Sequence, residues 1–103
     1  MCVVEVEGRG IQSSCTMPPE NGLKIHLNTA KTRRIRKTVL ELLLANHDKK
    51  CLTCDRSGNC ELQQYAEEYG IRDLRYAKKQ AEDYLAIDSS NPALVRDSNK
   101  CIL

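Results

Sequence analysis

The sequence contains no phenylalanine and no tryptophan, and only four tyrosines among its 103 residues. Large aromatic side chains supply much of the buried area in protein cores, so this chain has little aromatic mass with which to stabilise a fold. A chain of this length is at most one ordinary domain and buries only a small core. We therefore expect a bound metal to supply part of the stability, as it does in other small domains.

Long apolar runs and a strong charge of one sign are also missing. No stretch approaches the ~20 apolar residues of a membrane-spanning helix. The formal net charge is +2 with 29% charged residues, which gives no indication of a nucleic-acid partner. Residues Met1–Glu5 have neither the basic head nor the apolar run of a secretory signal. We therefore expect a cytoplasmic chain with no membrane span.

Cysteine, in contrast, is abundant, with six residues in the chain. An even count in a short chain can indicate a disulfide framework. Three of the cysteines, however, lie beside a histidine in one run of fourteen residues with the spacing His-x3-Cys-x2-Cys-x5-Cys. In a reducing compartment, cysteines clustered in this way indicate metal binding rather than disulfides.

The four residues of this run are His47, Cys51, Cys54 and Cys60. The Cys-x2-Cys pair can reach one metal centre from a single turn, and Cys60 can reach it from the mouth of a following helix. Zinc binds three cysteines and one histidine tetrahedrally. A 4Fe–4S cluster also needs four protein ligands, which are usually thiolates. The compact run modestly favours the larger centre, and on ligand chemistry alone both metals remain open.

Periodicity predicts strands first and helices afterwards. The long central helix follows a cap at Asn28 or Thr29, and we expect its six apolar side chains from Ile35 to Leu44 to be buried on both flanks. Gly70 is expected to end the next helix. The predicted segments are strands at 3–7, 11–16 and 23–27, helices at 29–46, 61–69 and 73–84, a linker at 88–92 and an extended segment at 93–95.

The surroundings of the metal-binding run resemble a known iron–sulfur module. The helical segment Arg36–Leu44 precedes the run, and Cys54–Leu62 has the pattern Cys-Asp-Arg-x-Gly-x-Cys-Glu-Leu. Over essentially its whole length the chain is similar to the N-terminal electron-transfer region of FeFe hydrogenases. The same module occurs in the large iron–sulfur subunit of respiratory complex I and in NAD-linked formate dehydrogenases. The resemblance implies a 4Fe–4S cluster held by His47, Cys51, Cys54 and Cys60.

The two ends resemble parts of neighbouring domains in that family. Cys2 and Cys15 resemble the third and fourth ligands of a plant-type 2Fe–2S domain, whose first two ligands have no counterpart here. Cys101 resembles the first ligand of a two-cluster ferredoxin domain, so it would be part of an incomplete 4Fe–4S set. The resemblance therefore implies a fragment of a longer electron-transfer protein, with the catalytic domain and any catalytic residues outside this chain.

The resemblance implies an α+β fold, in which the C-terminal remnant of a 2Fe–2S ferredoxin-like β-grasp precedes a small helical 4Fe–4S domain. The predicted division is 1–28, 29–87 and 88–103, the last being a linker and the start of a truncated ferredoxin domain. The implied function is electron relay in an oxidoreductase, first an FeFe hydrogenase and alternatively complex I or formate dehydrogenase. Partners would be neighbouring iron–sulfur domains or subunits and a redox protein. A zinc-stabilised interaction module is the alternative of another class.

Overall fold

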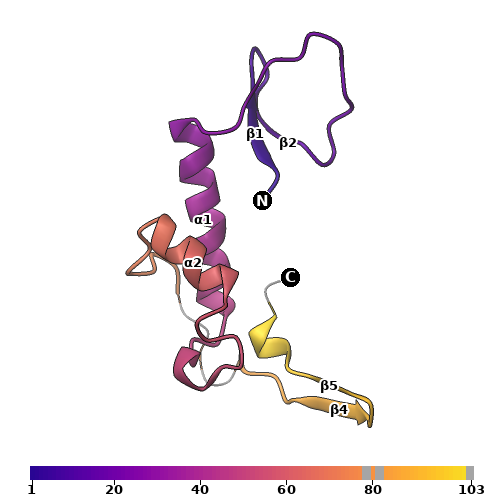
Figure 1. Ribbon diagram of the computed structural model, residues 1–103, viewed down its shortest axis with the longest axis vertical. Coiled ribbons are helices and arrows are strands. Elements are labelled where there is room, and N and C mark those ends of the chain that lie inside the picture. The colour runs from indigo at the N-terminus through magenta and orange to yellow at the C-terminus, as the bar shows by residue number, and fades with distance from the viewer. Residues whose placement is uncertain (78–79, 81–82, 102–103) are drawn as a thin grey trace. The chain divides into compact units, whose positions relative to one another are not determined.

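The computed structural model describes residues 1–77, 80 and 83–101 and is a mixed α+β structure with two small sheets (Figure 1). It divides into two units, Met1–Val39 and Leu40–Leu103, which are described separately below. The elements are β1 (Val3–Val6), β2 (Gly10–Ser13), β3 (Ile25–His26), α1 (Ala30–Asn46), the 3-10 turn η1 (Cys51–Thr53), α2 (Glu61–Glu68), β4 (Asp88–Asn91), β5 (Leu94–Arg96) and the 3-10 turn η3 (Ser98–Lys100).

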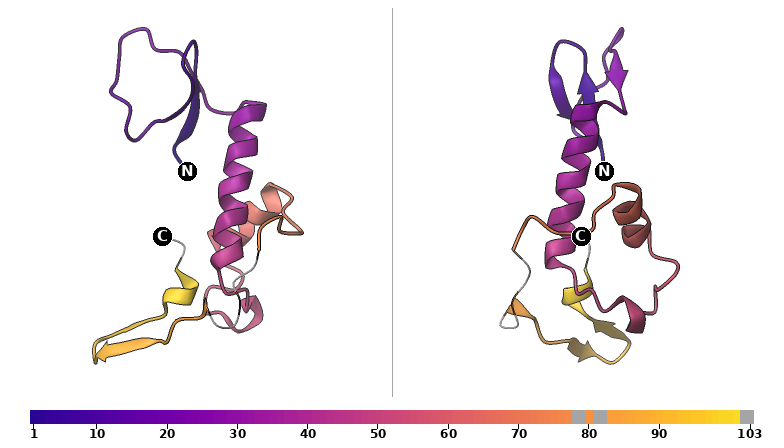
Figure 2. Two further views of the ribbon diagram at one scale, coloured as in Figure 1. Left: turned by 180° about the vertical axis from the view of Figure 1, so that it is seen from behind. Right: turned by 90° about the vertical axis from the view of Figure 1, so that its left-hand side faces the viewer.

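The first unit is built on a three-stranded antiparallel sheet with the order β2-β1-β3 (Figure 2). In β1, Val4 and Val6 are buried while their neighbours are more exposed, as the alternating sequence predicts for a sheet with one covered face. The predicted strands at 3–7 and 11–16 are confirmed with shorter bounds. The third strand is reduced to two residues, because pairing with β1 extends only across Ile25 and His26.

Two threonines fix the start of α1. The backbone N–H of Thr29 donates to Oγ1 of Thr32 at 2.9 Å, and the N–H of Thr32 donates to Oγ1 of Thr29 at 3.2 Å. This reciprocal arrangement satisfies two amides that a helix N-terminus otherwise leaves unpaired, in the manner of a capping box. The predicted start of the helix after Thr29 and its end at Asn46 are both confirmed.

In the second unit the C-terminal half of α1 and α2 carry the core. Leu40, Ala45 and Leu62 are buried there. The expectation that all six apolar side chains of α1 are covered is wrong for Leu42, which remains 45% exposed. Glu41 is instead buried, because its carboxylate accepts hydrogen bonds from Nε and Nη2 of Arg75 at 2.7 and 2.6 Å. An ion pair has taken part of the surface that an all-apolar stripe would occupy.

Gly70 ends α2 as predicted. Its φ is +59°, a conformation that glycine adopts without steric cost, and the N–H groups of Gly70 and Ile71 donate to the carbonyls of Glu67 and Ala66. The helix predicted at 73–84 is wrong for the described residues 73–77, which form bends and loop, and residues 78–79 and 81–82 lie outside the described residues. Its weak apolar stripe gave no face to bury, and Arg75 pairs with α1 instead.

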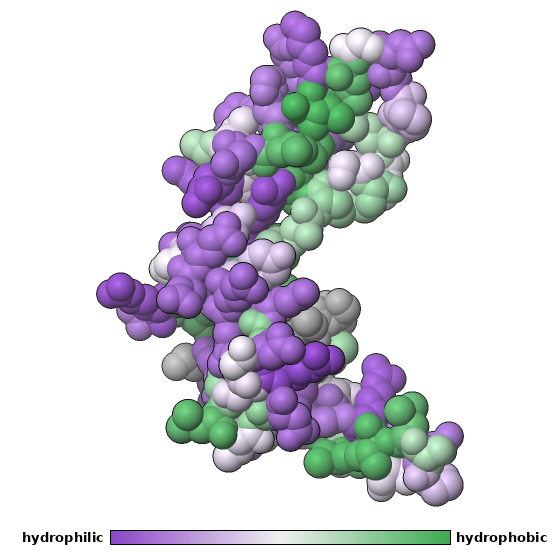
Figure 3. Space-filling model, viewed as in Figure 1, coloured by the Kyte–Doolittle hydropathy of each residue, from purple (hydrophilic) through white to green (hydrophobic). Residues whose placement is uncertain are grey.

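The segment predicted as a linker is a strand. Asp88–Asn91 forms β4 and pairs with β5 in an exposed hairpin. Its polar side chains shape the turn, since Oδ1 of Asn91 accepts the N–H of Ala93 at 2.9 Å. The exposed side chains of Leu94 and Val95 give this hairpin an apolar surface (Figure 3). Within the described residues, no helix combines the length and apolar character needed to cross a membrane.

Candidate metal centre

His47 extends from the C-terminal end of α1. Its backbone N–H donates to the carbonyl of Leu43 at 3.0 Å, so the residue continues the hydrogen-bonding pattern of the helix. The imidazole is half-buried, and its Nδ1 is a buried atom with no hydrogen-bond partner among the described residues. A buried polar atom in that state usually indicates an unseen water, ion or other ligand. Either nitrogen of a neutral imidazole can bind a metal.

The loop that follows is shaped by consecutive tight turns. Cys51 opens η1, and the N–H of Cys54 donates to the carbonyl of Cys51 at 3.3 Å. The N–H of Ser57 then donates to the carbonyl of Cys54 at 2.9 Å. Gly58 has a φ of +79°, which permits the reversal before Cys60. These turns hold Cys51 and Cys54 in one compact segment.

Cys60 occupies the N-cap position of α2. Its backbone is extended, its side chain makes no capping hydrogen bond, and its carbonyl accepts the N–H of Gln64 at 3.1 Å. Serine, threonine, aspartate and asparagine are the usual residues at this position because their oxygens cap the helix. A cysteine there leaves its sulfur available for another contact, beside the positive end of the helix dipole.

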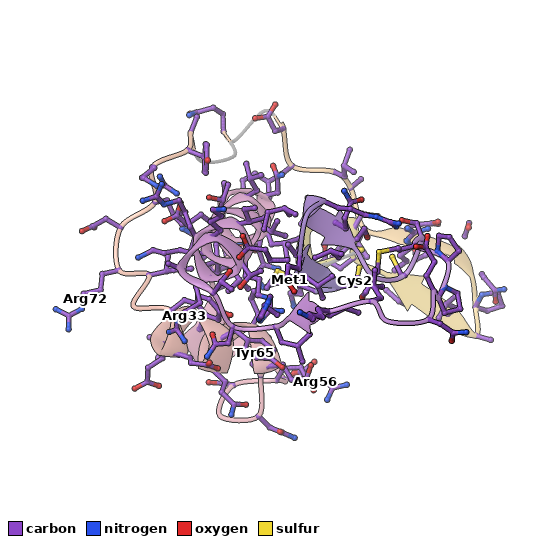
Figure 4. All side chains as sticks on the ribbon, turned by 90° about the horizontal axis from the view of Figure 1, so that it is seen from above. Met1, Cys2, Arg33, Arg56, Tyr65 and Arg72 are labelled. Atoms are coloured by element: carbon purple, nitrogen blue, oxygen red, sulfur yellow. The ribbon has the colours of Figure 1, made fainter. Side chains whose placement is uncertain are left out.

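All four residues of the metal-binding run line one cavity of about 340 Å³ within the second unit. Its volume falls at the lower end of the ~300–1,000 Å³ typical of ligand and cofactor sites. Apolar and cationic side chains complete the wall, and Figure 4 shows Arg56 and Arg72 extending outward from the ribbon. The apolar ones are Leu44, Leu62, Ala66, Ile71 and Leu74, and the cationic ones are Lys49, Arg56 and Arg72.

The four side chains surround a volume rather than one point. Among the described residues, no three histidine, cysteine, aspartate or glutamate side chains are close enough together to hold a single metal ion. Three sulfur donors and one nitrogen donor around a cavity of this size fit an iron–sulfur cluster, which binds soft donors. The buried Nδ1 of His47, unpaired by protein, agrees with that fit.

The structure also brings Cys2 and Cys15 together in the first unit. Their Sγ atoms lie 3.1 Å apart, and both side chains are exposed (Figure 4). Oγ of Ser13 lies 3.4 Å from Sγ of Cys2 and 3.2 Å from Sγ of Cys15. Hydrogen bonds from Ser13 and then Cys15 lower the pKa of the Cys2 thiol to about 7. The strand register, which pairs Val3 with Ser13, was the signal that could have placed Ser13 in this group.

Cys101 lies apart from the cavity. It follows η3, its backbone N–H donates to the carbonyl of Ser98 at 3.4 Å, and its side chain is exposed. It does not line the cavity formed by the other cysteines. Residues 102–103, which follow it in the predicted ferredoxin lead-in, lie outside the described residues.

Residues 36–75, which contain all four residues of the run, match the family described as the NADH-ubiquinone oxidoreductase-G iron–sulfur binding region. The chain belongs to this 4Fe–4S family. The resemblance inferred from the motif and the assignment of a 4Fe–4S cofactor to it are therefore confirmed. This iron–sulfur region recurs in hydrogenases and in NADH-quinone oxidoreductases.

Two curated relatives illustrate the range of the family. The chain is 42% identical over 104 residues to the NADP-reducing hydrogenase subunit HndD of Solidesulfovibrio fructosivorans, covering 100% of this chain and 17% of that protein. It is 32% identical over 103 residues to the mitochondrial NADH-ubiquinone oxidoreductase 78 kDa subunit of Candida albicans, covering 99% of this chain and 14% of that protein. The chain thus spans about a sixth of the length of these relatives.

A solved structure extends the similarity to three dimensions. The crystal structure of an NAD+-reducing NiFe-hydrogenase in the H2-reduced state matches with a TM-score of 0.82 and 38% sequence identity. The match covers 99% of this chain and 42% of that one. The backbone arrangement described above therefore recurs in a hydrogenase of another metal type.

Proposed function

We propose that the chain is an electron-transfer module in which His47, Cys51, Cys54 and Cys60 hold one 4Fe–4S cluster. The observation that carries this proposal is that all four side chains line a single cavity within the residues that match the iron–sulfur family. Such a cluster accepts and releases one electron at a time. The protein contributes the ligands, a wall that limits water, and charges that set the reduction potential.

The apolar part of the wall supports this function. Leu44, Leu62 and Ala66 line the cavity, and Leu62 is 6% exposed. Limited access of water is one of the factors that set the potential of an iron–sulfur cluster. The cations Lys49 and Arg56 line the same cavity, so they would favour the more negative, reduced state.

The imidazole of His47 has a direct electrostatic consequence. Replacing one thiolate by a neutral imidazole makes the cluster less negative by one unit, so adding an electron is easier. The midpoint potential should therefore be higher than that of an all-cysteine site, as it is in other histidine-ligated clusters. His47→Cys should lower the midpoint measured by redox titration; a midpoint that stays equal or rises contradicts the role proposed for His47.

For the host enzyme, we propose a hydrogenase, first of the FeFe type. Support comes from the higher identity to a hydrogenase subunit, 42%, than to the complex I subunit, 32%, over nearly the same residues. The alternative host is complex I or a formate dehydrogenase. In either host the module would lie among neighbouring iron–sulfur domains or subunits, within the proposed division 1–28, 29–87 and 88–103.

The same proposal covers the cysteines at the two ends. Cys2 and Cys15 would be half of a 2Fe–2S set, and Cys101 would be one ligand of a further 4Fe–4S cluster. The contact of 3.1 Å between Sγ of Cys2 and Sγ of Cys15 supports a shared role for the first two. On this proposal neither set binds a cluster with the residues of this chain alone.

Metal analysis under anaerobic conditions tests the proposal. After reconstitution with iron and sulfide, the chain should contain about four irons and four sulfides and give an EPR signal when reduced. Cys54→Ser should lose that content. Cys101→Ser is the matched control, because Cys101 is exposed and lies outside the cavity. Equal loss in both variants would contradict the assignment of ligands.

A zinc-stabilised interaction module is the second candidate, favoured by the ligand set of three cysteines and one histidine alone. A colourless protein with one zinc per chain, unable to accept iron and sulfide, would establish that function in place of electron transfer.

A further inference from the structure

We propose that Asn99 is a positioning residue for His47, and that it holds the histidine end of the metal-binding run through its own backbone oxygen. The inference rests on the proposed function, since it concerns how the cluster's histidine is oriented. Asn99 lies in η3, which is more than fifty residues after His47 in the sequence.

The backbone of His47 is fixed on both sides. On one side, the N–H of His47 donates to the carbonyl of Leu43 at 3.0 Å, within the hydrogen-bonding pattern of α1. On the other side, the N–H of the next residue, Asp48, donates to the backbone oxygen of Asn99 at 3.2 Å. The two peptide groups that flank the His47 Cα are therefore anchored by different elements. Rotation of the backbone at His47, which would turn the imidazole, is restricted by both anchors.

Asn99 is itself held firmly enough to serve as an anchor. It is 7% exposed, and its side chain pairs with both backbone groups of Leu85: Oδ1 accepts the N–H at 2.9 Å and Nδ2 donates to the carbonyl at 2.8 Å. Nδ2 and the backbone N–H of Asn99 each donate to Oδ1 of Asp97 at 3.0 Å. A side-chain amide is needed here, because it combines a donor and an acceptor in one short group.

A second contact joins the same segments. Nζ of Lys50 lies 3.3 Å from Oδ2 of Asp48 and 5.9 Å from the ring centroid of Tyr84. Tyr84 precedes Leu85, the residue that Asn99 grips. The start of the metal-binding loop is thus tied to the segment around Leu85 by an ion pair and a cation–π contact as well as through Asn99.

Two substitutions separate the groups of the side chain. Asn99→Leu has a similar volume and removes both the donor and the acceptor. Asn99→Asp keeps the acceptor for the N–H of Leu85 but loses the donor to its carbonyl, and it places a second carboxylate beside Asp97. Asn21→Leu is the matched control, since Asn21 is an exposed residue of the first unit.

Hydrogen exchange provides the first measurement and needs no bound cluster. Asn99→Leu should accelerate exchange of the Leu85 and Asp48 amides about tenfold or more, and Asn99→Asp should give a smaller acceleration. The Ser14 amide, bonded to the carbonyl of Cys2 in the first unit, should be unaffected. Unchanged exchange at Asp48 in both variants would overturn the proposal, whether or not the protein binds iron.

The second measurement separates positioning from general stabilisation. In the reconstituted and reduced protein, pulsed EPR detects the coupling of the cluster to the nitrogen of His47. Asn99→Asp and Asn99→Leu should change that coupling and shift the midpoint potential, while Asn21→Leu should do neither. Faster exchange with an unchanged nitrogen coupling would make Asn99 a purely structural residue and overturn the proposal. A wild-type protein that binds iron and sulfide without any nitrogen coupling would instead overturn the ligand assignment of His47.

Discussion

Truncation of Leu62 tests whether the small core around the cavity holds the second unit together. Leu62 is the buried residue of α2, only 6% exposed, and its side chain also lines the cavity. Substitution by alanine removes buried methyl groups and enlarges the space behind them, which typically costs about 2–5 kcal/mol. Because one side of Leu62 already faces a cavity, we expect the lower half of that range.

Leu52 is a matched control within the same loop region. It lies between Cys51 and Thr53 and is 98% exposed, so the same substitution removes almost no buried area. A surface change of this kind usually alters stability by less than about 0.5 kcal/mol. The expected difference between Leu62→Ala and Leu52→Ala is therefore about 1.5–3 kcal/mol.

Urea denaturation and calorimetry of the reconstituted protein under anaerobic conditions measure this difference. For a domain of this size, 1 kcal/mol corresponds to a shift of about 4–8 °C in Tm. Leu62→Ala should therefore melt at least ~6 °C below Leu52→Ala. If the two variants melt together, apolar packing of α2 does not stabilise the unit, and the argument from burial fails.

Two further predictions concern charges. The thiol of Cys2 should react with iodoacetamide along a pH profile with its midpoint at about 7, and Ser13→Ala should move that midpoint upward, because the Ser13 hydrogen bond is the largest cause of the lowered pKa; a profile unchanged by Ser13→Ala would contradict this cause. Arg75→Met should lower Tm more than Arg34→Met, because the first leaves the buried Glu41 carboxylate without its partner whereas Arg34 is an exposed residue of α1. Equal melting temperatures for these two variants would show that the pair adds nothing.

The features that the sequence predicted well depend on neighbouring residues. The alternation of Val4 and Val6, the cap at Thr29 and the glycine that ends α2 each act within a few positions of the chain. The metal-binding run belongs to the same class, since its spacing alone indicates a shared centre. Local patterns of this kind are visible to periodicity and spacing rules.

The features that were missed depend on contacts between distant segments. Nothing near Glu41 indicates that a charged residue on an apolar stripe would be buried, because its partner Arg75 lies 34 positions away. The exposed strand β4 has no apolar alternation, and its pairing with β5 makes it a strand. Asn99 attracted no attention in the sequence, since its partners are at Leu85 and Asp48.

The placement of the cavity residues also has a consequence for the order of folding. The four residues proposed to bind the cluster lie within fourteen consecutive positions, so bringing them together closes only a short loop. Short loops close in ~10–100 ns and at a low entropic cost. During synthesis, this segment is complete and able to collect its metal well before Asn99 has been added to the chain. The C-terminal segment therefore arrives at a site that is already formed, and its contribution is to retain the cluster rather than to build it.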